Sequence, residues 1–208
     1  MRVVGFLVDD FGVGHGAIRL YFSGNRGYHL HVYDKRFEPL DQQGRAEIAE
    51  YMQGSSLPPN QSLSASIRRR PPMGPQGSGW TRRITGYVDT RRQDYPGTLQ
   101  KLVSDAIASQ RALVDSSVTT DIHRVFRLAG TLHGDTGMAK TRIESMADFD
   151  PQEDPVVLSA KPVNVRVGFY PRFRMKHREF GPFMKPETVE LPAYAAVPIL
   201  TRGLGETA

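Results

Sequence analysis

The feature that most constrains the fold of this chain is a glycine-punctuated loop between two alternating segments. Apolar residues occupy every second position from 18 to 22, and again from 28 to 32. Alternation with a period of two is typical of half-buried β-strands, whose successive side chains point to opposite faces. Two such segments joined by a short glycine-containing loop predict a β-hairpin.

The loop reads Ser23-Gly24-Asn25-Arg26-Gly27-Tyr28-His29 and places a hydroxyl, a guanidinium and an imidazole close together. Glycine allows positive φ and lets backbone N–H groups approach an anion closely. The planar fork of Arg26 can bind two phosphate oxygens at once. The loop therefore fits a phosphate ligand, although an ordinary hairpin turn with a surface arginine would have the same composition.

Composition narrows the class of protein. The chain has 208 residues, 39% of them hydrophobic, which is enough to bury a core. Its 27 Lys and Arg against 22 Asp and Glu favour a polyanionic partner. The absence of cysteine excludes disulfides, thiolate catalysis and cysteine-ligated zinc. No apolar run approaches the about 18 residues of a membrane span, and no basic leader precedes an apolar stretch, so we expect a soluble intracellular protein.

Helical and strand patterns recur along the chain. Apolar spacing predicts a short helix over 42–52, with Asp41 as its N-cap, and a second helix over 98–113. Alternating residues over 163–169 predict a strand, and the tail over 191–203 reads as a helix with a kink or break at Pro198. Phe173, Phe180 and Phe183 are expected to add to the core.

The region 53–79 differs in character because it is rich in proline, glycine and serine and contains the run Arg68-Arg69-Arg70. Such composition predicts a long loop. The three arginines could contact nucleic acid or simply be solvated. From Trp80 onward the sequence indicates an ordered segment that could pack a helical insert.

A second dense segment spans 115–137. Thr119 or Thr120 can cap a helix that would end at 129–130, with Arg124 and Arg127 sharing one face. The inward-facing positions of that helix would be Val118, Ile122, Val125 and Phe126. The residues that follow, Thr131-Leu132-His133-Gly134-Asp135-Thr136-Gly137, predict a polar turn.

Taken together, the two segments resemble the catalytic small subunit of the archaeal and eukaryotic type of DNA primase. The loop 23–29 is similar to that family's Ser-Gly-(Arg/Asn)-Arg-Gly-x-His loop. The stretch 114–137 resembles the family segment that carries its last metal-binding aspartate and a nucleotide-contacting histidine. Phe180-Gly181-Pro182-Phe183 and Glu190-Leu191-Pro192 are similar to its C-terminal strand and closing helix, whereas about 53–97 lacks a convincing counterpart.

The resemblance implies a role for six residues. Those implied to hold the nucleotide and its triphosphate are Ser23, Arg26, His29, Arg127 and His133. Asp115 is implied to be a catalytic ligand of Mg²⁺ or Mn²⁺. Phosphoryl transfer depends mainly on positioning and charge neutralisation, which suits such a set. Each residue has another reading: His133 could cap a turn, Arg127 could pair with a carboxylate, and Asp115 could start a helix.

The chain departs from the family at the metal site. Two-metal catalysis needs several carboxylates around ions about 3.5–4 Å apart. The family supplies two of them as an Asp-x-Asp pair on a strand before the Ser-Gly loop, but only 22 residues precede Ser23 here. Asp9 and Asp10 form the acidic pair in that stretch, and neighbouring strand residues point to opposite faces, so we do not assign them as ligands. We expect that the N-terminal part of the domain is missing through a late start codon, a fragment or degeneration, and that the zinc knuckle of many relatives is absent.

These observations predict an α+β fold, with a central mixed sheet that holds both segments and is flanked by helices. We expect a single primase-type catalytic domain over 1–208, with 1–52 and 98–208 as its core and 53–97 as a loop-rich or helical insert. The implied activity is synthesis of short primers from nucleoside triphosphates on single-stranded DNA, with a primase large subunit as partner, and activity of this chain alone is expected to be weak or absent. The alternative is a non-catalytic nucleotide- or nucleic-acid-binding remnant in a replication complex. An unrelated RNA-binding domain is disfavoured because no aromatic-rich sheet signature occurs.

Overall fold

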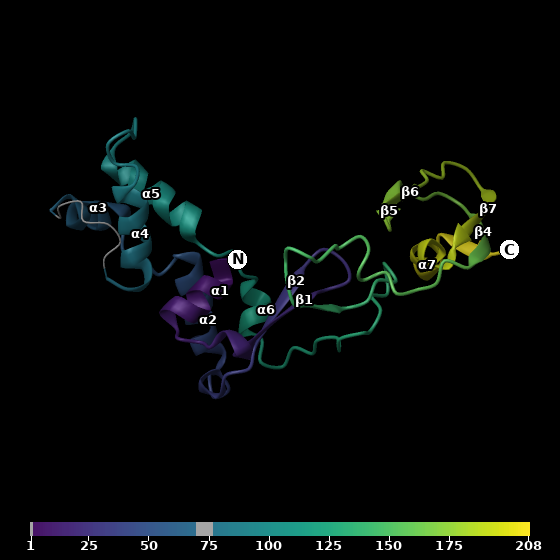
Figure 1. Cartoon of the computed structure of the whole chain (residues 1–208), viewed down its shortest axis with the longest axis horizontal. Coiled ribbons are helices and arrows are strands. Elements are labelled where there is room, and N and C mark those ends of the chain that lie inside the picture. Colours follow the sequence, from purple (N-terminus) through teal and green to yellow (C-terminus); the bar gives the residue numbers. More distant parts are fainter. Residues whose placement is uncertain (1, 70–76) are drawn as a thin grey trace. The chain divides into compact units, whose positions relative to one another are not determined.

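The computed structural model describes residues 2–69 and 77–208 (Figure 1). The chain divides into two compact units. Unit 1 comprises Met1–Ile18 and Asp34–Arg124, and unit 2 comprises Arg19–Tyr33 and Val125–Ala208. Each unit is therefore assembled from two stretches of sequence.

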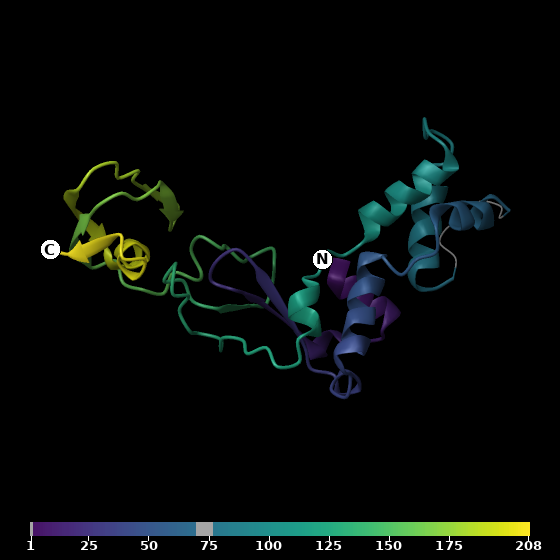
Figure 2. The same ribbon diagram turned by 180° about the vertical axis from the view of Figure 1, so that it is seen from behind.

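Unit 1 is helical over its described residues. Its helices are α1 (Arg2–Gly5), a π-helical turn (Phe6–Asp10), 3₁₀ turns (His15–Ala17 and Lys35–Phe37), α2 (Gln42–Gln53), α3 (Asn60–Arg68), α4 (Gly79–Asp89), α5 (Leu99–Gln110) and α6 (Ser116–Thr120). Figures 1 and 2 both show α4 and α5 side by side, with α3 beside them.

The core of unit 1 forms around Phe6 and Trp80, which are both buried and whose ring centroids are 5.4 Å apart. The indole Nε1 of Trp80 donates to the carbonyl of Tyr51 at 2.6 Å, so its polar edge is satisfied inside the core. Ile84 and Val88 follow Trp80 at four-residue intervals and are also buried, which places one apolar face of α4 against the core.

Two helices of unit 1 confirm the sequence patterns. Asp41 caps α2, as predicted, by accepting a hydrogen bond from the N–H of Gly44 at 2.8 Å. Helix α5 begins after Thr98, whose hydroxyl accepts from the N–H of Lys101 at 3.2 Å. Helix α3 lies within 53–79, so the long loop predicted there is wrong over Asn60–Arg68, and α4 is the ordered segment predicted from Trp80 onward. Arg70 of the arginine run, and the prolines at 71, 72 and 75, lie outside the described residues.

Unit 2 contains the strands β1 (Ile18–Phe22), β2 (Tyr28–Val32), β3 (Thr141–Ile143), β4 (Pro162–Val167), β5 (Phe173–Met175), β6 (Arg178–Phe180), β7 (Glu187–Pro192) and β8 (Gly205–Thr207), and the helix α7 (Ala193–Thr201). The α+β class is confirmed. The strands form separate sheets in the orders β2-β1-β3, β7-β4-β8 and β5-β6, and the pairings resolved among them are antiparallel, instead of one central mixed sheet. Strands of three to six residues favour such small sheets over one wide sheet.

The hairpin predicted from the alternating pattern is confirmed, because β1 and β2 are neighbours in the first sheet. Strand β1 also pairs with the distant β3, with Leu20 opposite Ile143. Leu20, Phe22 and Ile143 are buried together, so the apolar face of the hairpin is covered within unit 2.

The C-terminal part of unit 2 packs α7 against the β7-β4-β8 sheet. Val165 and Val167 are completely buried in its core, which confirms the strand predicted there, although Phe169 lies beyond the end of β4 and is 60% exposed. Phe180 and Phe183 are buried as expected, with Phe173 packed against them. Helix α7 runs through Pro198 without ending there.

The helix predicted to start at Thr119 or Thr120 and to end at 129–130 is wrong. Helix α6 ends at Thr120, and the residues from 121 to 131 are not helical. The side chains expected to face inward are exposed, namely Val118, Ile122, Val125 and Phe126. Among the described residues, no other part of the protein buries these side chains. Packing of an apolar face supplies most helical stability in proteins, so spacing alone does not form the helix.

Within the residues described, no helix is both long enough and apolar enough to cross a membrane.

Candidate functional site

Ser23 organises the loop between β1 and β2. Its Oγ accepts hydrogen bonds from the N–H groups of Asn25 at 3.3 Å and Gly27 at 3.1 Å, and its own N–H donates to the carbonyl of Gly27 at 2.8 Å. Ser23 is buried, whereas Asn25, Arg26 and Gly27 are exposed. The serine therefore shapes a compact loop that holds Arg26 at its outer edge.

Gly24 is required by the loop for two reasons. Its φ is +78°, which L side chains rarely adopt, and a Cβ at this position would lie 2.7 Å from the carbonyl oxygen of Met138. The sequence allows a positive φ at both loop glycines, but the structure has a positive φ at Gly24 and not at Gly27.

The second sequence segment docks on this loop. The guanidinium of Arg127 donates through Nη2 to the carbonyl of Ser23 and through Nη1 to the carbonyl of Thr131 at 3.5 Å. The hydroxyl of Thr136 donates to the carbonyl of Gly24. Two segments that are about a hundred residues apart in sequence thus meet at one loop within unit 2.

The Arg127 guanidinium holds the loop in place, but these two hydrogen bonds do not use all of its N–H donors. A guanidinium has five N–H donors, and the two bonds to carbonyls engage two of them. The Arg127 side chain can therefore hold the loop and still offer donors to an anion. No carboxylate partner of Arg127 occurs among the ion pairs of the described residues.

His133 lies in the turn that precedes β3. Its Nδ1 accepts a hydrogen bond from the N–H of Asp135 at 3.1 Å, so the neutral ring carries its proton on Nε2. Its carbonyl accepts from the N–H groups of Thr136 and Gly137, which makes His133 a turn residue as well as a candidate donor. His29, at the start of β2, is partly buried and belongs to the same unit.

Asp115 lies in unit 1, whereas the other five candidate residues lie in unit 2. It is the N-cap of α6 and accepts hydrogen bonds through Oδ1 from Ser117 Oγ at 2.7 Å and from the N–H of Val118 at 3.3 Å. The bond from Ser117, and then that from Val118, lowers the pKa of Asp115, which favours the ionised carboxylate. Its reading as a helix-starting residue is thus realised, and a metal-binding role stays a prediction.

The segment before Asp115 is fixed by α2. Gln53 Nε2 donates to the carbonyl of Val114 and to Ser116 Oγ, both at 2.9 Å, and the N–H of Ala112 donates to the carbonyl of Met52 at 2.9 Å. The position of the aspartate within unit 1 therefore depends on the C-terminal turn of α2.

Asp10 has a different role from a metal ligand in this structure. Its segment is helical and not a strand, so the argument from opposite strand faces does not apply. The side chain of Asp10 is 6% exposed and pairs with Arg83 at 3.1 Å, while Tyr51 donates to it at 3.2 Å. Asp9 is 57% exposed and lies 3.8 Å from Arg83. Asp10 therefore links the N-terminal turn to α4.

The described residues do not fit a complete divalent-metal site. Across 2–69 and 77–208, no three His, Asp or Glu side chains come close enough together to hold a metal ion. Asp115 offers one carboxylate, whereas a pair of metals needs several.

Two residues that sequence reasoning missed join the loop environment. The Nζ of Lys140 donates to the carbonyl of Arg127 at 2.9 Å and lies 3.3 Å from His31 Nε2. His31 follows His29 by two positions on β2, so the alternating pattern already placed both histidines on the same face of the strand. The sequence carried no comparable signal for Lys140, which is 1% exposed.

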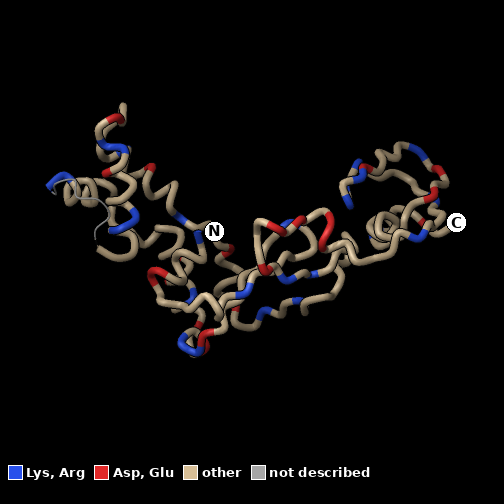
Figure 3. The backbone as a smooth tube through the Cα atoms, in the orientation of Figure 1, with Lys and Arg blue, Asp and Glu red and all other residues tan. Residues whose placement is uncertain are grey.

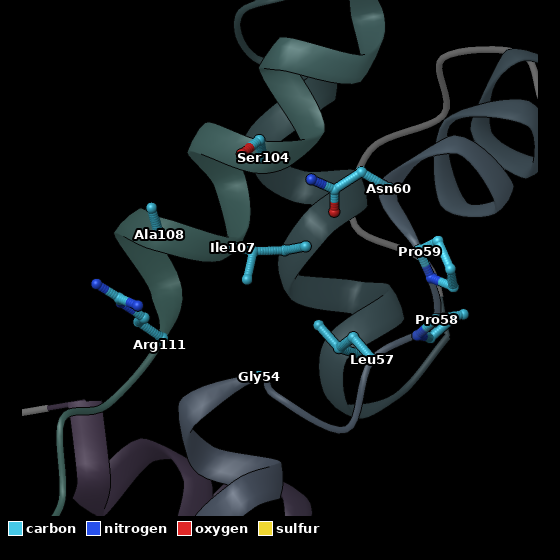
Figure 4. Close-up of a pocket in the computed structure, with 9 residues that line it drawn as sticks. All are labelled: Gly54, Leu57, Pro58, Pro59, Asn60, Ser104, Ile107, Ala108 and Arg111. Atoms are coloured by element: carbon cyan, nitrogen blue, oxygen red, sulfur yellow. The ribbon is translucent and has the colours of Figure 1, made fainter.

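Basic residues lie near the loop, whereas a cavity in unit 1 lies elsewhere in the chain. Figure 3 shows basic residues recurring along the part of the chain that holds β1 and β2 and the strand-like segment beside them. A cavity of about 410 Å³ lies in unit 1, bordered by the loop after α2 and by α5 (Figure 4). None of the six candidate residues lines this cavity.

Comparison with known proteins identifies the family. The sequence model of the DNA primase small subunit matches residues 1–145. The chain therefore belongs to the DNA primase small subunit family. It is 30% identical to the DNA primase small subunit PriS of Cenarchaeum symbiosum over 100% of this chain and 59% of that protein. It is 34% identical to PriS of Thermoplasma acidophilum over 88% of this chain and 56% of that protein.

A third relative, PriS of Nitrosopumilus maritimus, is 29% identical over 97% of this chain and 57% of its own length. The chain thus spans somewhat more than half the length of these curated relatives. The resemblance read from the loop and the segment around His133 is confirmed at the level of the family.

Proposed function

We propose that the loop between β1 and β2, together with Arg127 and His133, binds the triphosphate of a nucleoside triphosphate. The observation that carries the proposal is the docking of Arg127 on the carbonyl of Ser23, because it brings both family segments to one loop in unit 2. Arg26 and Arg127 would neutralise phosphate charge through their planar forks. His133 would donate from Nε2, since Nδ1 is already an acceptor.

The function in which this site would serve is the synthesis of short primers on single-stranded DNA, as one subunit of a primase with a large-subunit partner. Membership of the small-subunit family supports the proposal. Phosphoryl transfer depends on positioning and charge neutralisation, and the loop residues provide both for the triphosphate. The metal that the family resemblance implies is Mg²⁺ or Mn²⁺, and Asp115 would be one of its ligands.

The site is tested by fluorescence titration of the chain with a nucleoside triphosphate. We expect Arg26→Ala and His133→Ala each to weaken binding by about 10- to 150-fold, because each removes a charged or strongly polar contact worth about 1.5–3 kcal/mol. Arg174→Ala is the matched control, because it removes another exposed arginine, from β5, which is also in unit 2. Equal affinities in all four proteins would rule the site out.

A second function is favoured by one observation. The lack of a three-ligand metal cluster among the described residues suits a chain that binds nucleotides without joining them. This non-catalytic role predicts nucleotide binding with no primer synthesis even when a primase large subunit is added. Template-directed products under those conditions would exclude it.

A further inference from the structure

Lys140 is a buried cation that the proposed site does not yet use. It lies between the turn containing His133 and strand β3, and only 1% of its surface is exposed. Removing an ammonium group from water is costly unless hydrogen bonds compensate for the lost hydration. The burial of the Lys140 ammonium group must therefore be compensated by its contacts within the protein.

Those contacts join the two family segments. Nζ donates to the main-chain carbonyl of Arg127 at 2.9 Å and lies 3.3 Å from Nε2 of His31 on β2. It also lies 5.0 Å from the ring centroids of Tyr21 on β1 and of Phe126. An ammonium group only donates, so Nε2 of His31 must accept and the neutral ring carries its proton on Nδ1.

The surroundings of this cluster are basic. Burial is the main cause that lowers the pKa of His31, followed by the charges of Lys140 and His29. Burial also lowers the pKa of Lys140, followed by the charge of Arg127. The titratable and charged groups around the pair are therefore His29 on β2, Arg127 beside it, and Tyr21 on β1. The cations among them add positive charge beside the loop.

We propose that Lys140 is a positioning residue for the triphosphate loop: it ties the main chain at Arg127 to strand β2, so that the Arg127 guanidinium stays on the carbonyl of Ser23. This inference rests on the proposed function of the loop. Lys140 is too deeply buried to touch the ligand, and it acts through Arg127 and His31. The ring of Phe126, which packs edge-on against His31 at 4.8 Å, belongs to the same connection.

Inorganic triphosphate is the probe for the first measurement, with Lys140→Met as the variant that keeps the chain length and apolar stem but loses the donors. We expect its affinity to fall about 2- to 10-fold, as for the loss of one net hydrogen bond that orders the site. Lys185→Met removes an exposed lysine from unit 2 and serves as the matched control. Its affinity should not change.

Proton NMR reports on His31 and, through the amide signals of Asn25 and Gly27, on the loop itself, which a lysine that only filled the core would leave unchanged. The His31 pKa lies below its ordinary value of 6.5 in the native chain, and Lys140→Met should raise it because a neighbouring cation is removed. The amide signals of Asn25 and Gly27 should shift in the same variant, since the loop loses its fixed support. Neither effect is expected in Lys185→Met.

The outcomes separate this inference from the proposed function. If the native chain binds no triphosphate, the proposed function fails, while unchanged loop amides in Lys140→Met would overturn the role of Lys140. If Arg26→Ala weakens binding and Lys140→Met does not, the function stands and the Lys140 inference is overturned. Should Lys140→Met fail to fold, His31→Phe removes the acceptor but keeps an aromatic ring against Phe126, and unchanged affinity in that variant would overturn the inference.

Discussion

At the scale of single residues, the loop depends on groups that are small or buried, and less on its conspicuous arginine. Ser23 is 7% exposed, and its hydroxyl gathers two backbone N–H groups. Gly24 lets the loop approach the main chain at Met138. Arg26 can then sit exposed at the edge of a loop whose shape is fixed by its neighbours.

Two glycines with similar positive φ allow the cost of an unfavourable backbone conformation to be measured apart from the cost of a steric clash. Gly24 has φ +78° and a Cβ there would lie 2.7 Å from a carbonyl oxygen, whereas Gly130 has φ +84° and open space within 4 Å. We expect Gly130→Ala to cost about 1–2 kcal/mol of unfolding free energy, from the left-handed conformation alone. Gly24→Ala should cost roughly 1–3 kcal/mol more, because backbone must move to relieve the clash.

Urea unfolding of both variants and of the native chain measures the difference. Equal losses for the two alanines would mean that the main chain near Met138 yields easily, and that the loop is not held against it. A larger loss at Gly130 would contradict the packing described here.

The sequence predicts the residues that form a local pattern but not those brought together by tertiary contacts. The serine, glycines and arginine of the loop were predicted as a phosphate-binding set from residue type and spacing. The bond from Arg127 to Ser23 could not be derived from spacing, because it joins residues about a hundred positions apart. The family resemblance implied only that both residues serve one nucleotide site. Lys140 left no pattern in the sequence, because burial of a lysine is decided by tertiary neighbours.

At the scale of elements, periodicity predicted the pieces that bury an apolar face and failed where no such face exists. The hairpin, α2, α5, β4 and α7 were all anticipated from period or caps. The stretch from 121 to 131 has apolar residues at helical spacing, yet it is not helical, and within unit 2 Phe126 packs on His31 and Arg127 bonds to Ser23. Tertiary contacts thus override a weak local preference.

The connection between the N-terminal turn and α4 yields a prediction at this scale. Asp10 and Arg83 are 6% and 16% exposed, and Arg83 also lies 4.0 Å from the ring centroid of Phe6. Removing one partner leaves a buried charge, so Asp10→Ala should cost about 3–5 kcal/mol of unfolding free energy. Asp9→Ala is the neighbouring control, and at 57% exposure it should cost about 1 kcal/mol or less.

Circular dichroism during urea unfolding, which follows the helices of unit 1, measures both losses. If Asp9→Ala and Asp10→Ala were equally mild, the ion pair with Arg83 would contribute nothing to the docking of α4. The carboxyl of Asp10 would then be available for another role.

At the scale of the whole molecule, the family was foreseen and the division into two units was not. The resemblance rested on short motifs, and these identify a family without fixing how its pieces gather into compact bodies. Five candidate residues lie in unit 2 and Asp115 lies in unit 1. The proposed nucleotide-binding role and the proposed metal-binding role can therefore be tested with separate variants.

The chain alone, mixed with single-stranded DNA, the four nucleoside triphosphates and Mg²⁺ or Mn²⁺, is expected to give no template-dependent product. The physical reason is the lack of a three-ligand metal cluster within the part of the chain that the structure describes. Gel analysis of labelled products measures this. Primers that form with the native chain and with Asp121→Asn, but not with Asp115→Asn, would contradict the expectation and assign the chemistry to Asp115.

Strand β1 pairs with β3 across an interval of more than a hundred residues, with Phe22 opposite Thr141. On a ribosome, the first partner therefore emerges long before the second. At roughly 5–20 residues per second, the edge of β1 waits about 6–24 s for its neighbour. During that time the second stretch of unit 1, Asp34–Arg124, is synthesised, and a nascent hairpin with one open apolar edge is a natural client for chaperones.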